Sequence, residues 1–254
     1  MRDIVFHHHI FKNAGSSFSS ILDNNFGCSH VTIESPVPWE VLPQGEVTRF
    51  VQDNPQIKAV SSHTARLLPK EASGVKFHPM LFLRHPLDRV GSVYSFERRQ
   101  PIDSPSIGAK IARESGIKEY VAWRLKKGNG AVVKNFQVVF ISGRELDMRC
   151  AEATKDDFEL ALERIAQMKV FGLVEYFHDS LLNFRNYFER EVGIFEIQDT
   201  HQNQRPDREG PLETRIETLR QALGNELYEE LIEKNSLDIE LYTVACKLFM
   251  HLRS

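Results

Sequence analysis

Two short stretches of this chain each join an apolar, strand-like run to a polar turn and the start of a helix. The first turn, FKNAGSSF, occupies residues 11–18 and follows the apolar run at residues 4–10; the second, LFLRHPLDRVGSVY, occupies residues 81–94. A strand that leads through a turn into a helix is the repeating unit of a parallel sheet covered by helices. The sequence therefore predicts an α/β fold with three layers, a central parallel sheet flanked by helices, in a single domain that covers residues 1–254.

The first turn contains the kinds of groups that bind an oxyanion. Lys12 carries a mobile positive charge, Ser16 and Ser17 provide hydroxyl donors, and Gly15 permits a close approach of the backbone. A helix that opens at the serines would add free N–H groups and the positive end of its dipole. On this turn alone, an ordinary strand-to-helix turn capped by Ser16 is an equally good interpretation.

The order of residues in this turn argues against a metal-dependent kinase. In the common nucleoside-triphosphate loop, GxxxxGK[ST], the lysine follows the glycine and the next hydroxyl binds magnesium. Here Lys12 precedes Gly15, and no Lys-Ser pair follows. A nucleoside kinase stays as an alternative, and it would require magnesium and a triphosphate.

The second turn places an arginine and a serine where both can reach one anion. The run at residues 78–84 is strand-like, and Pro86 fits the first turn of the helix that follows. Arg84 at the strand end and Ser92 about two helical turns later can grip a phosphate together. In the alternative interpretation, Arg84 pairs with Asp88 and Ser92 lies on the helix surface.

These two turns carry a family resemblance. FKNAGSSF resembles the phosphosulfate loop of the sulfotransferases that use 3'-phosphoadenosine 5'-phosphosulfate (PAPS), whose pattern is a lysine, two residues, a glycine, two hydroxyl residues and an aromatic. LRHPLDRVGSVY resembles their 3'-phosphate motif, with His85 where an aspartate or asparagine is more usual. Four further segments match in the expected order: SSHTARLLP at residues 61–69, NFQVVFISG at 135–143, FGLVEYFHDSL at 171–181 and NSLDIELYTVA at 235–245.

The resemblance implies a P-loop NTPase-like sulfotransferase fold and a set of nucleotide contacts. Arg84 and Ser92 would hold the 3'-phosphate of PAPS, and Phe18 matches the aromatic residue that stacks on adenine. By helical spacing alone, Phe18 can equally pack in the core with Ile21 and Leu22. The residues implied for the 5'-phosphosulfate are Lys12, Asn13, Ala14, Gly15, Ser16 and Ser17.

The resemblance also implies a reaction, in which an acceptor hydroxyl attacks the sulfuryl group of PAPS in line. His63 matches the histidine that acts as the base, although a lone histidine beside two serines is more often a structural hydrogen-bonding residue. Lys12 would stabilise the departing phosphate, so the reaction needs no metal. The KNAGSSF and HTAR segments are more like the carbohydrate 2-O branch, so a sugar hydroxyl is the expected acceptor. In the late polar loop, Arg205 or Arg208 would cover the 3'-phosphate or the acceptor, or would be a solvated charge.

Three consecutive histidines, His7, His8 and His9, lie inside the first strand-like run. Alternation along a strand puts His7 and His9 on one face and His8 on the other. No cysteine or carboxylate lies near them at a zinc-type spacing, so a metal-binding protein is a weaker alternative. We expect one of these histidines to line the site near the sugar or acceptor.

Local patterns predict several further elements. Thr154 and Asp157 resemble a capping box at the start of a helix, and apolar residues repeat at helical spacing over residues 177–188. The segment at residues 98–116 contains two prolines and Gly108, and we expect it to be a loop or lid. Residues 194–197 are strand-like, and residues 199–210 are expected to form a surface loop.

Composition limits the remaining possibilities. The chain has 32 basic and 35 acidic side chains, a formal charge of -3, and therefore no global attraction to nucleic acid. Three widely separated cysteines, Cys28, Cys150 and Cys246, predict free thiols. No apolar run approaches the ~20 residues of a membrane span, so a cytoplasmic enzyme is expected. A non-catalytic scaffold protein that binds the nucleotide without transferring anything is the remaining alternative.

Overall fold

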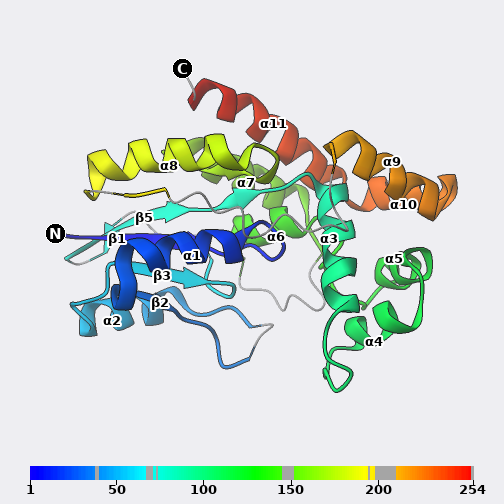
Figure 1. Cartoon of the computed structure of the whole chain (residues 1–254), viewed down its shortest axis with the longest axis horizontal. Helices are drawn as coiled ribbons and strands as arrows, with labels where there is room; N and C mark the ends of the chain where they lie inside the picture. The colour runs from blue at the N-terminus through cyan, green and yellow to red at the C-terminus, as the bar shows by residue number, and fades with distance from the viewer. Residues whose placement is uncertain are drawn as a thin grey trace.

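The computed structural model describes residues 1–37, 40–66, 71–72, 74–144, 152–193, 195–197 and 210–252. Its central sheet has the strand order β2-β3-β1-β5-β4, and a second sheet pairs β6 with β7 (Figure 1). Every pairing is parallel except that of β4 with β5. The strands are β1 (Arg2–His8), β2 (His30–Thr32), β3 (Ala59–Ser62), β4 (Glu71–Ala72), β5 (Val75–Met80), β6 (Phe82–Leu83) and β7 (Gly172–Leu173). The predicted α/β fold with a parallel central sheet is confirmed.

Helices cover both faces of this sheet. The α-helices are α1 (Gly15–Phe26), α2 (Gln44–Asp53), α3 (Pro86–Arg98), α4 (Ile107–Glu114), α5 (Ile117–Leu125), α6 (Phe136–Ser142), α7 (Lys155–Gln167), α8 (Phe177–Glu191), α9 (Leu212–Leu223), α10 (Asn225–Lys234) and α11 (Ser236–Leu252). Short 3-10 turns occur at Gly27–Ser29 and Val174–Tyr176.

The alternation of side chains along β1 produces the layers. Val5 packs in one core cluster with Phe18 of α1 and Phe184 of α8, whereas Ile4 and Phe6 pack in another with residues of α2. The carboxyl ends of β1, β3 and β5 point toward α3, and α3, α4, α5, α9 and α10 gather beyond that edge (Figure 1). The sheet therefore directs its turns toward one side of the molecule, as parallel sheets do.

The predicted strand at residues 78–84 is two strands instead of one. β5 ends at Met80 and pairs with β1, whereas β6 begins at Phe82 and pairs with β7. The carbonyl of Leu81 accepts a hydrogen bond of 2.9 Å from the amide of Gly172, so the chain changes partners at that residue. An apolar run shows that a strand is buried but does not show which neighbour it pairs with. The predicted strand at residues 194–197 is also wrong for its described part, because residues 195–197 form none.

The segment at residues 98–116, predicted to be a loop, contains the helix α4. Ser106 caps it by accepting a hydrogen bond of 3.2 Å from the amide of Ala109. Gly108 lowers the intrinsic helix propensity of this segment. Packing explains why a glycine occupies this position. A Cβ atom at Gly108 would lie 1.9 Å from Nη2 of Arg124, whose guanidinium pairs with Glu97.

Several local predictions are confirmed. Thr154 and Asp157 form a reciprocal capping box at the start of α7. Pro86 occupies the first turn of α3, and the stripe on α8 packs into the core through Leu181, Phe184 and Phe188. Within the described residues, no helix is both long enough and apolar enough to span a bilayer. The loop at residues 199–210 lies outside the described residues except for its last residue.

Candidate active site at the carboxyl edge of the sheet

The turn between β1 and α1 has an unusual backbone. Lys12 and Ala14 both adopt left-handed conformations, with φ of 67° and 61°. Residues other than glycine rarely adopt this backbone conformation, so contacts with the rest of the fold must stabilise the turn. The positive φ angles in this turn fall on Lys12 and Ala14 rather than on Gly15.

Asn13 is the residue that fixes this turn. It is buried, and its Nδ2 donates hydrogen bonds of 2.7 Å to the carbonyl of Phe82 and to Oε1 of Gln137. The same Oε1 accepts a bond of 3.0 Å from the amide of Arg84, and Gln137 Nε2 donates to the Arg84 carbonyl at 2.9 Å. The side chain of Asn13 is thus committed to joining the two turns, and only its backbone can face an anion.

Arg84 makes direct contact with the first turn. Its Nη1 donates a hydrogen bond of 3.1 Å to the carbonyl of Lys12, across 72 residues of sequence. Its Nε and Nη2 also lie 2.7 Å and 2.6 Å from Oδ2 of Asp88, so the alternative pairing exists as well. Arg215 of α9 adds a second guanidinium, with Nε 2.8 Å from Asp88 Oδ1. The two turns therefore converge, and the convergence includes a cation that no sequence motif indicated.

The side chains of Ser92 and Lys12 take no part in the hydrogen bond that joins Arg84 to the first turn. Ser92 is buried in α3, which contradicts the alternative that it lies on the helix surface. Within the described part of the chain, no hydrogen bond joins its hydroxyl to Arg84. The ammonium of Lys12 lies 4.6 Å from the ring centre of Phe96 in α3, a cation–π distance. Lys12 therefore starts from a position beside the turn, and its four-carbon side chain can rotate toward an anion.

The start of α1 faces the same side. Ala14 is its N-cap residue, no side chain caps it by a hydrogen bond, and no acidic residue lies in its first turn. The interpretation in which Ser16 caps the helix is therefore wrong. Ser16 is exposed and Ser17 is half-buried, so both hydroxyls lie at or near the surface. An uncapped helix start without acidic neighbours favours an anion.

Phe18 lies inside the core. Its ring is fully buried, with the rings of Phe82 and Phe184 5.6 Å and 5.4 Å away. Ile21 and Leu22 belong to the same cluster. This burial matches the packing alternative, and it leaves the Phe18 ring no exposed face for an adenine.

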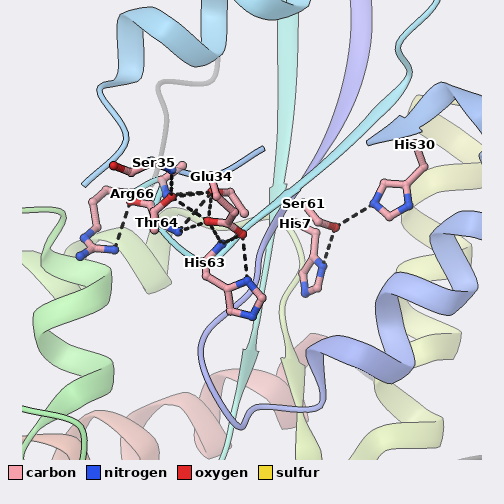
Figure 2. Close-up of polar contacts among 10 residues, drawn as sticks. His7, His30, Glu34, Ser35, Ser61, His63, Thr64 and Arg66 are labelled. Carbon is pink, nitrogen blue, oxygen red and sulfur yellow. Dashed lines mark hydrogen bonds and ion pairs between the residues drawn. The ribbon is translucent and has the colours of Figure 1, made fainter. Parts of the chain in front are cut away.

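His63 and Glu34 form the polar centre of the edge (Figure 2). Nδ1 of His63 lies 2.9 Å from Oε1 of Glu34, and the backbone amide of His63 donates to the same oxygen at 2.8 Å. Thr64 donates to the other oxygen, Oε2, from its amide at 3.0 Å and from its hydroxyl at 2.7 Å. The side chain of His63 remains 43% exposed. A carboxylate that orients an accessible imidazole is the arrangement of a general base.

The surroundings keep Glu34 ionised. Burial acts to raise the pKa of Glu34, but the hydrogen bonds from His63 and Thr64 outweigh it and leave this pKa below its usual value. The ionised carboxylate accepts from Nδ1–H of His63, which leaves Nε2 as the nitrogen that can accept a proton. Sequence patterns did not single out Glu34, because it lies in a polar stretch with no motif.

His9 links this pair to the phosphate turn. Its ring centre lies 3.7 Å from that of His63, and the two rings are stacked. Burial and then the neighbouring His63 lower the pKa of His9 to about 3, so the ring is neutral near pH 7. The space above Gly15 is filled by this ring, since a Cβ there would lie 1.8 Å from Cδ2 of His9. Gly15 thus accommodates His9, and the expectation that it lets an oxyanion approach is corrected.

Gly15→Ala is expected to destabilise the fold by about 1–3 kcal/mol, because His9 is held between Gly15 and His63 and cannot move away cheaply. Chemical denaturation of the purified protein measures this. Gly45→Ala is the matched control, since a Cβ at Gly45 in α2 has no neighbour within 4 Å. Adding His9→Ala should remove most of the Gly15→Ala effect. A loss of the same size in the His9→Ala background would contradict the proposed clash.

His7 and His8 lie on opposite faces of β1, as predicted. His7 contacts His9 by ring stacking at 5.1 Å and Phe18 at the same distance, whereas His8 contacts Phe6 at 4.6 Å. Within the described residues, no group of three or more histidine, cysteine or acidic side chains is arranged to hold a metal.

Ser61, His30 and Asp23 have the connectivity of a hydrolase triad. His30 Nε2 lies 2.9 Å from Ser61 Oγ (Figure 2). On its other side, His30 Nδ1 lies 2.7 Å from Asp23 Oδ1. However, Ser61 is only 1% exposed, and its hydroxyl also bonds His7 Nδ1 at 3.0 Å. A nucleophile must reach its substrate, so this chain is a buried hydrogen-bond network that orients the histidines.

Arg205 and Arg208 lie outside the described residues, as does Cys150. The other two cysteines, Cys28 and Cys246, are free thiols.

No protein-family model matches the chain. A protein of Archaeoglobus fulgidus that bears the name "Uncharacterized protein" is 34% identical to it over 246 residues, which make up 95% of each chain. The chain therefore belongs to the same family as this archaeal protein.

Proposed function

We propose that this protein is a PAPS-dependent sulfotransferase with a P-loop NTPase-like sulfotransferase fold. The reaction transfers the sulfuryl group from PAPS to an acceptor hydroxyl, with a sugar hydroxyl as the first choice of acceptor. The products are a sulfate ester and adenosine 3',5'-bisphosphate.

One observation carries the proposal: the guanidinium of Arg84 donates to the carbonyl of Lys12. The two turns that resemble the phosphosulfate loop and the 3'-phosphate motif thus meet at one edge of the sheet, although 72 residues separate the bonded pair. A donor with two separated phosphates needs this arrangement.

The groups at this edge fit a polyanionic nucleotide. Lys12, Arg84 and Arg215 contribute positive charge, and the uncapped start of α1 contributes oriented N–H groups. Asp88 sits between the two arginines and holds both guanidinium groups in place. Lys12 and Arg84 therefore remain the proposed ligands, with the backbone of residues 13–17 beside them. Ser92 also remains a proposed ligand of the 3'-phosphate. Its hydroxyl is buried in α3, so the phosphate would have to reach it there.

The proton of the acceptor hydroxyl would pass to Nε2 of His63. Glu34 accepts from Nδ1–H, fixes the ring orientation and stabilises the imidazolium that forms. Lys12 would then place its ammonium against the departing phosphate oxygen, where negative charge develops. The acceptor proton is held at His63 until it escapes to solvent through the exposed side of the ring.

Transfer of radiolabelled sulfate from PAPS to a panel of polysaccharides, lipids, phenols and peptides tests this proposal. We expect a labelled ester and release of adenosine 3',5'-bisphosphate, both without added magnesium. Binding of the nucleotide without any transfer would instead indicate the non-catalytic scaffold. Magnesium-dependent phosphoryl transfer from ATP would indicate a kinase and would overturn the proposal.

A further inference from the structure

His85 directly follows Arg84 in the second turn, and its imidazole ring has no role in the proposed reaction. It is the N-cap residue of α3. Its Nδ1 atom is buried and has no hydrogen-bond partner among the described residues, although the residue as a whole is only half-buried. Buried polar atoms are normally paired, so this ring has hydrogen-bonding capacity that the fold does not use.

Contacts from two other segments fix the position of His85. Glu175 accepts a hydrogen bond of 2.9 Å from the His85 amide through Oε1, and one of 2.8 Å from the Tyr242 hydroxyl through Oε2. The Tyr242 ring, in α11, packs against the imidazole in a T-shaped arrangement, with 5.3 Å between the ring centres. Burial raises the pKa of Tyr242 and of its neighbour Cys246, so both side chains are neutral near pH 7.

The charges around this turn balance one another when the imidazole is neutral. Arg84 and Arg215 carry two positive charges, and Asp88, which contacts both guanidinium groups, carries one negative charge. Glu175 carries the other. Burial raises the pKa of Glu175, but the hydrogen bonds that it accepts oppose this shift, and both of its oxygens act as acceptors, as in a carboxylate. These four charges sum to zero, and Lys12 is assigned to the other phosphate of the donor.

A bound 3'-phosphate would disturb this balance. A phosphate monoester carries a charge of about -1.5 to -2 at pH 7. In the protein without a ligand, burial lowers the pKa of His85 below its usual value; Asp88 acts in the opposite direction and Arg215 in the same one. The ring is therefore mostly neutral near pH 7. An anion beside it favours the charged imidazolium, so binding of the phosphate raises the pKa of His85.

We propose that His85 takes up a proton from solvent when the 3'-phosphate binds beside Arg84, and that the imidazolium then donates a hydrogen bond to this phosphate. The identity of the anion rests on the proposed sulfotransferase function, whereas the proton uptake rests on the unpaired imidazole in a cluster whose other charges cancel. Nucleotide affinity then rises as the pH falls through the range between the pKa values of His85 in the free and bound protein. Above both values, His85 makes no pH-dependent contribution.

Calorimetry at pH 6.5 counts the protons taken up when adenosine 3',5'-bisphosphate binds. It uses two phosphate-free buffers whose ionisation enthalpies differ. The wild-type protein should take up about half a proton or more beyond the uptake of His85→Asn, since asparagine keeps a hydrogen-bond donor but has no site for a proton. Comparing the two proteins is necessary because the phosphate itself exchanges protons near pH 6. His251→Asn, at an exposed position near the end of α11, is the matched control and should behave like the wild-type protein.

The pH dependence of affinity provides a second readout. At pH 6, His85→Asn should bind the bisphosphate about tenfold more weakly than the wild-type protein does, because a hydrogen bond to a charged group is lost. At pH 8.5 this ratio should fall to about one. Adenosine 5'-monophosphate, which lacks the 3'-phosphate, should bind both proteins equally at either pH. Equal proton uptake by the two proteins, or the same ratio at pH 6 and 8.5, would overturn the proposal.

A third measurement follows the ring itself in the wild-type protein. With nitrogen-15 histidine, the His85 imidazole signal should titrate at a higher pH in inorganic phosphate than in chloride at the same ionic strength. His85→Asn identifies this signal by its loss, and His85→Gln serves the same purpose if the asparagine variant does not fold. A pKa of His85 that is the same in both salts contradicts the proposal.

These measurements separate the role of His85 from the proposed function. If the bisphosphate gives no heat while inorganic phosphate raises the pKa of His85, the sulfotransferase assignment fails and the proton-linked anion site stands. If the bisphosphate binds without excess proton uptake over His85→Asn, the role of His85 is overturned and the proposed function stands. No heat together with no response of the ring overturns both.

Discussion

Replacing His63 by alanine is expected to lower turnover by about 10²- to 10⁴-fold, the range over which a positioned acid or base contributes. Affinity for adenosine 3',5'-bisphosphate should stay at the wild-type level. The reason is the position of the His63 side chain: it is 43% exposed, it stacks on His9, and within the described residues its hydrogen bond goes to Glu34 and not to the phosphate turn. Single-turnover transfer and calorimetry on the same protein measure the two quantities.

Two further variants make this prediction specific. Glu34→Gln keeps the shape of the side chain but removes the negative charge, so it should slow turnover less than the loss of His63 does. Lys12→Ala should reduce both turnover and nucleotide affinity, because Lys12 is proposed to contact the donor phosphate. Normal turnover in His63→Ala would remove His63 from the mechanism.

The second large effect concerns stability in acid. His8 is fully buried, and burial lowers its pKa from 6.5 to about 3. Unfolding returns the pKa to its ordinary value, so between these limits the unfolded state binds a proton that the folded state does not. Stability from this group is therefore complete above pH 6.5 and is lost as the pH falls toward 3.

The magnitude can be measured against a variant that lacks this titration. Between pH 6.5 and 4.5, the free energy of unfolding of the wild-type protein should fall by about 2 kcal/mol more than that of His8→Phe. His7 and His9, whose pKa values burial also lowers, add to the slope in both proteins and cancel in the comparison. Urea denaturation across this pH range provides the data. Equal slopes for the two proteins would show that His8 is not buried as a neutral ring.

Sequence patterns predicted the elements that depend on local signals. The strand, turn and helix around residues 4–22, the capping box of α7 and the stripe of α8 all follow from periodicity and capping, which act over a few residues. Pairing depends on distant partners, so the division of residues 78–84 between β5 and β6 was not predictable. The helix α4 was missed because Gly108 reads as a helix breaker, whereas it makes room for the Arg124–Glu97 pair.

The candidate site also contains residues that local patterns indicated and residues that only the fold reveals. Lys12 and Arg84 were found because each belongs to a turn with its own pattern, and the structure brings the two turns together. Glu34 and Arg215 reach the site from segments without a motif, so only the folded chain reveals them. Asn13 and Gly15 lie in the predicted turn, but their roles differ from the expected ones. The Asn13 side chain joins the two turns, and Gly15 makes space for His9. Such roles depend on packing, which spacing along the chain does not describe.

The most direct test of the account compares two nucleotides by calorimetry: adenosine 3',5'-bisphosphate and adenosine 5'-monophosphate, which differ only in the 3'-phosphate. We expect the bisphosphate to bind the wild-type protein at least about tenfold more tightly, since a guanidinium grip on a phosphate is a strong contact. Arg84→Gln should remove this difference, and Lys12→Ala should weaken both nucleotides while preserving it. Absence of binding heat with either nucleotide, or a difference that survives Arg84→Gln, would contradict the claim that the two turns hold one donor.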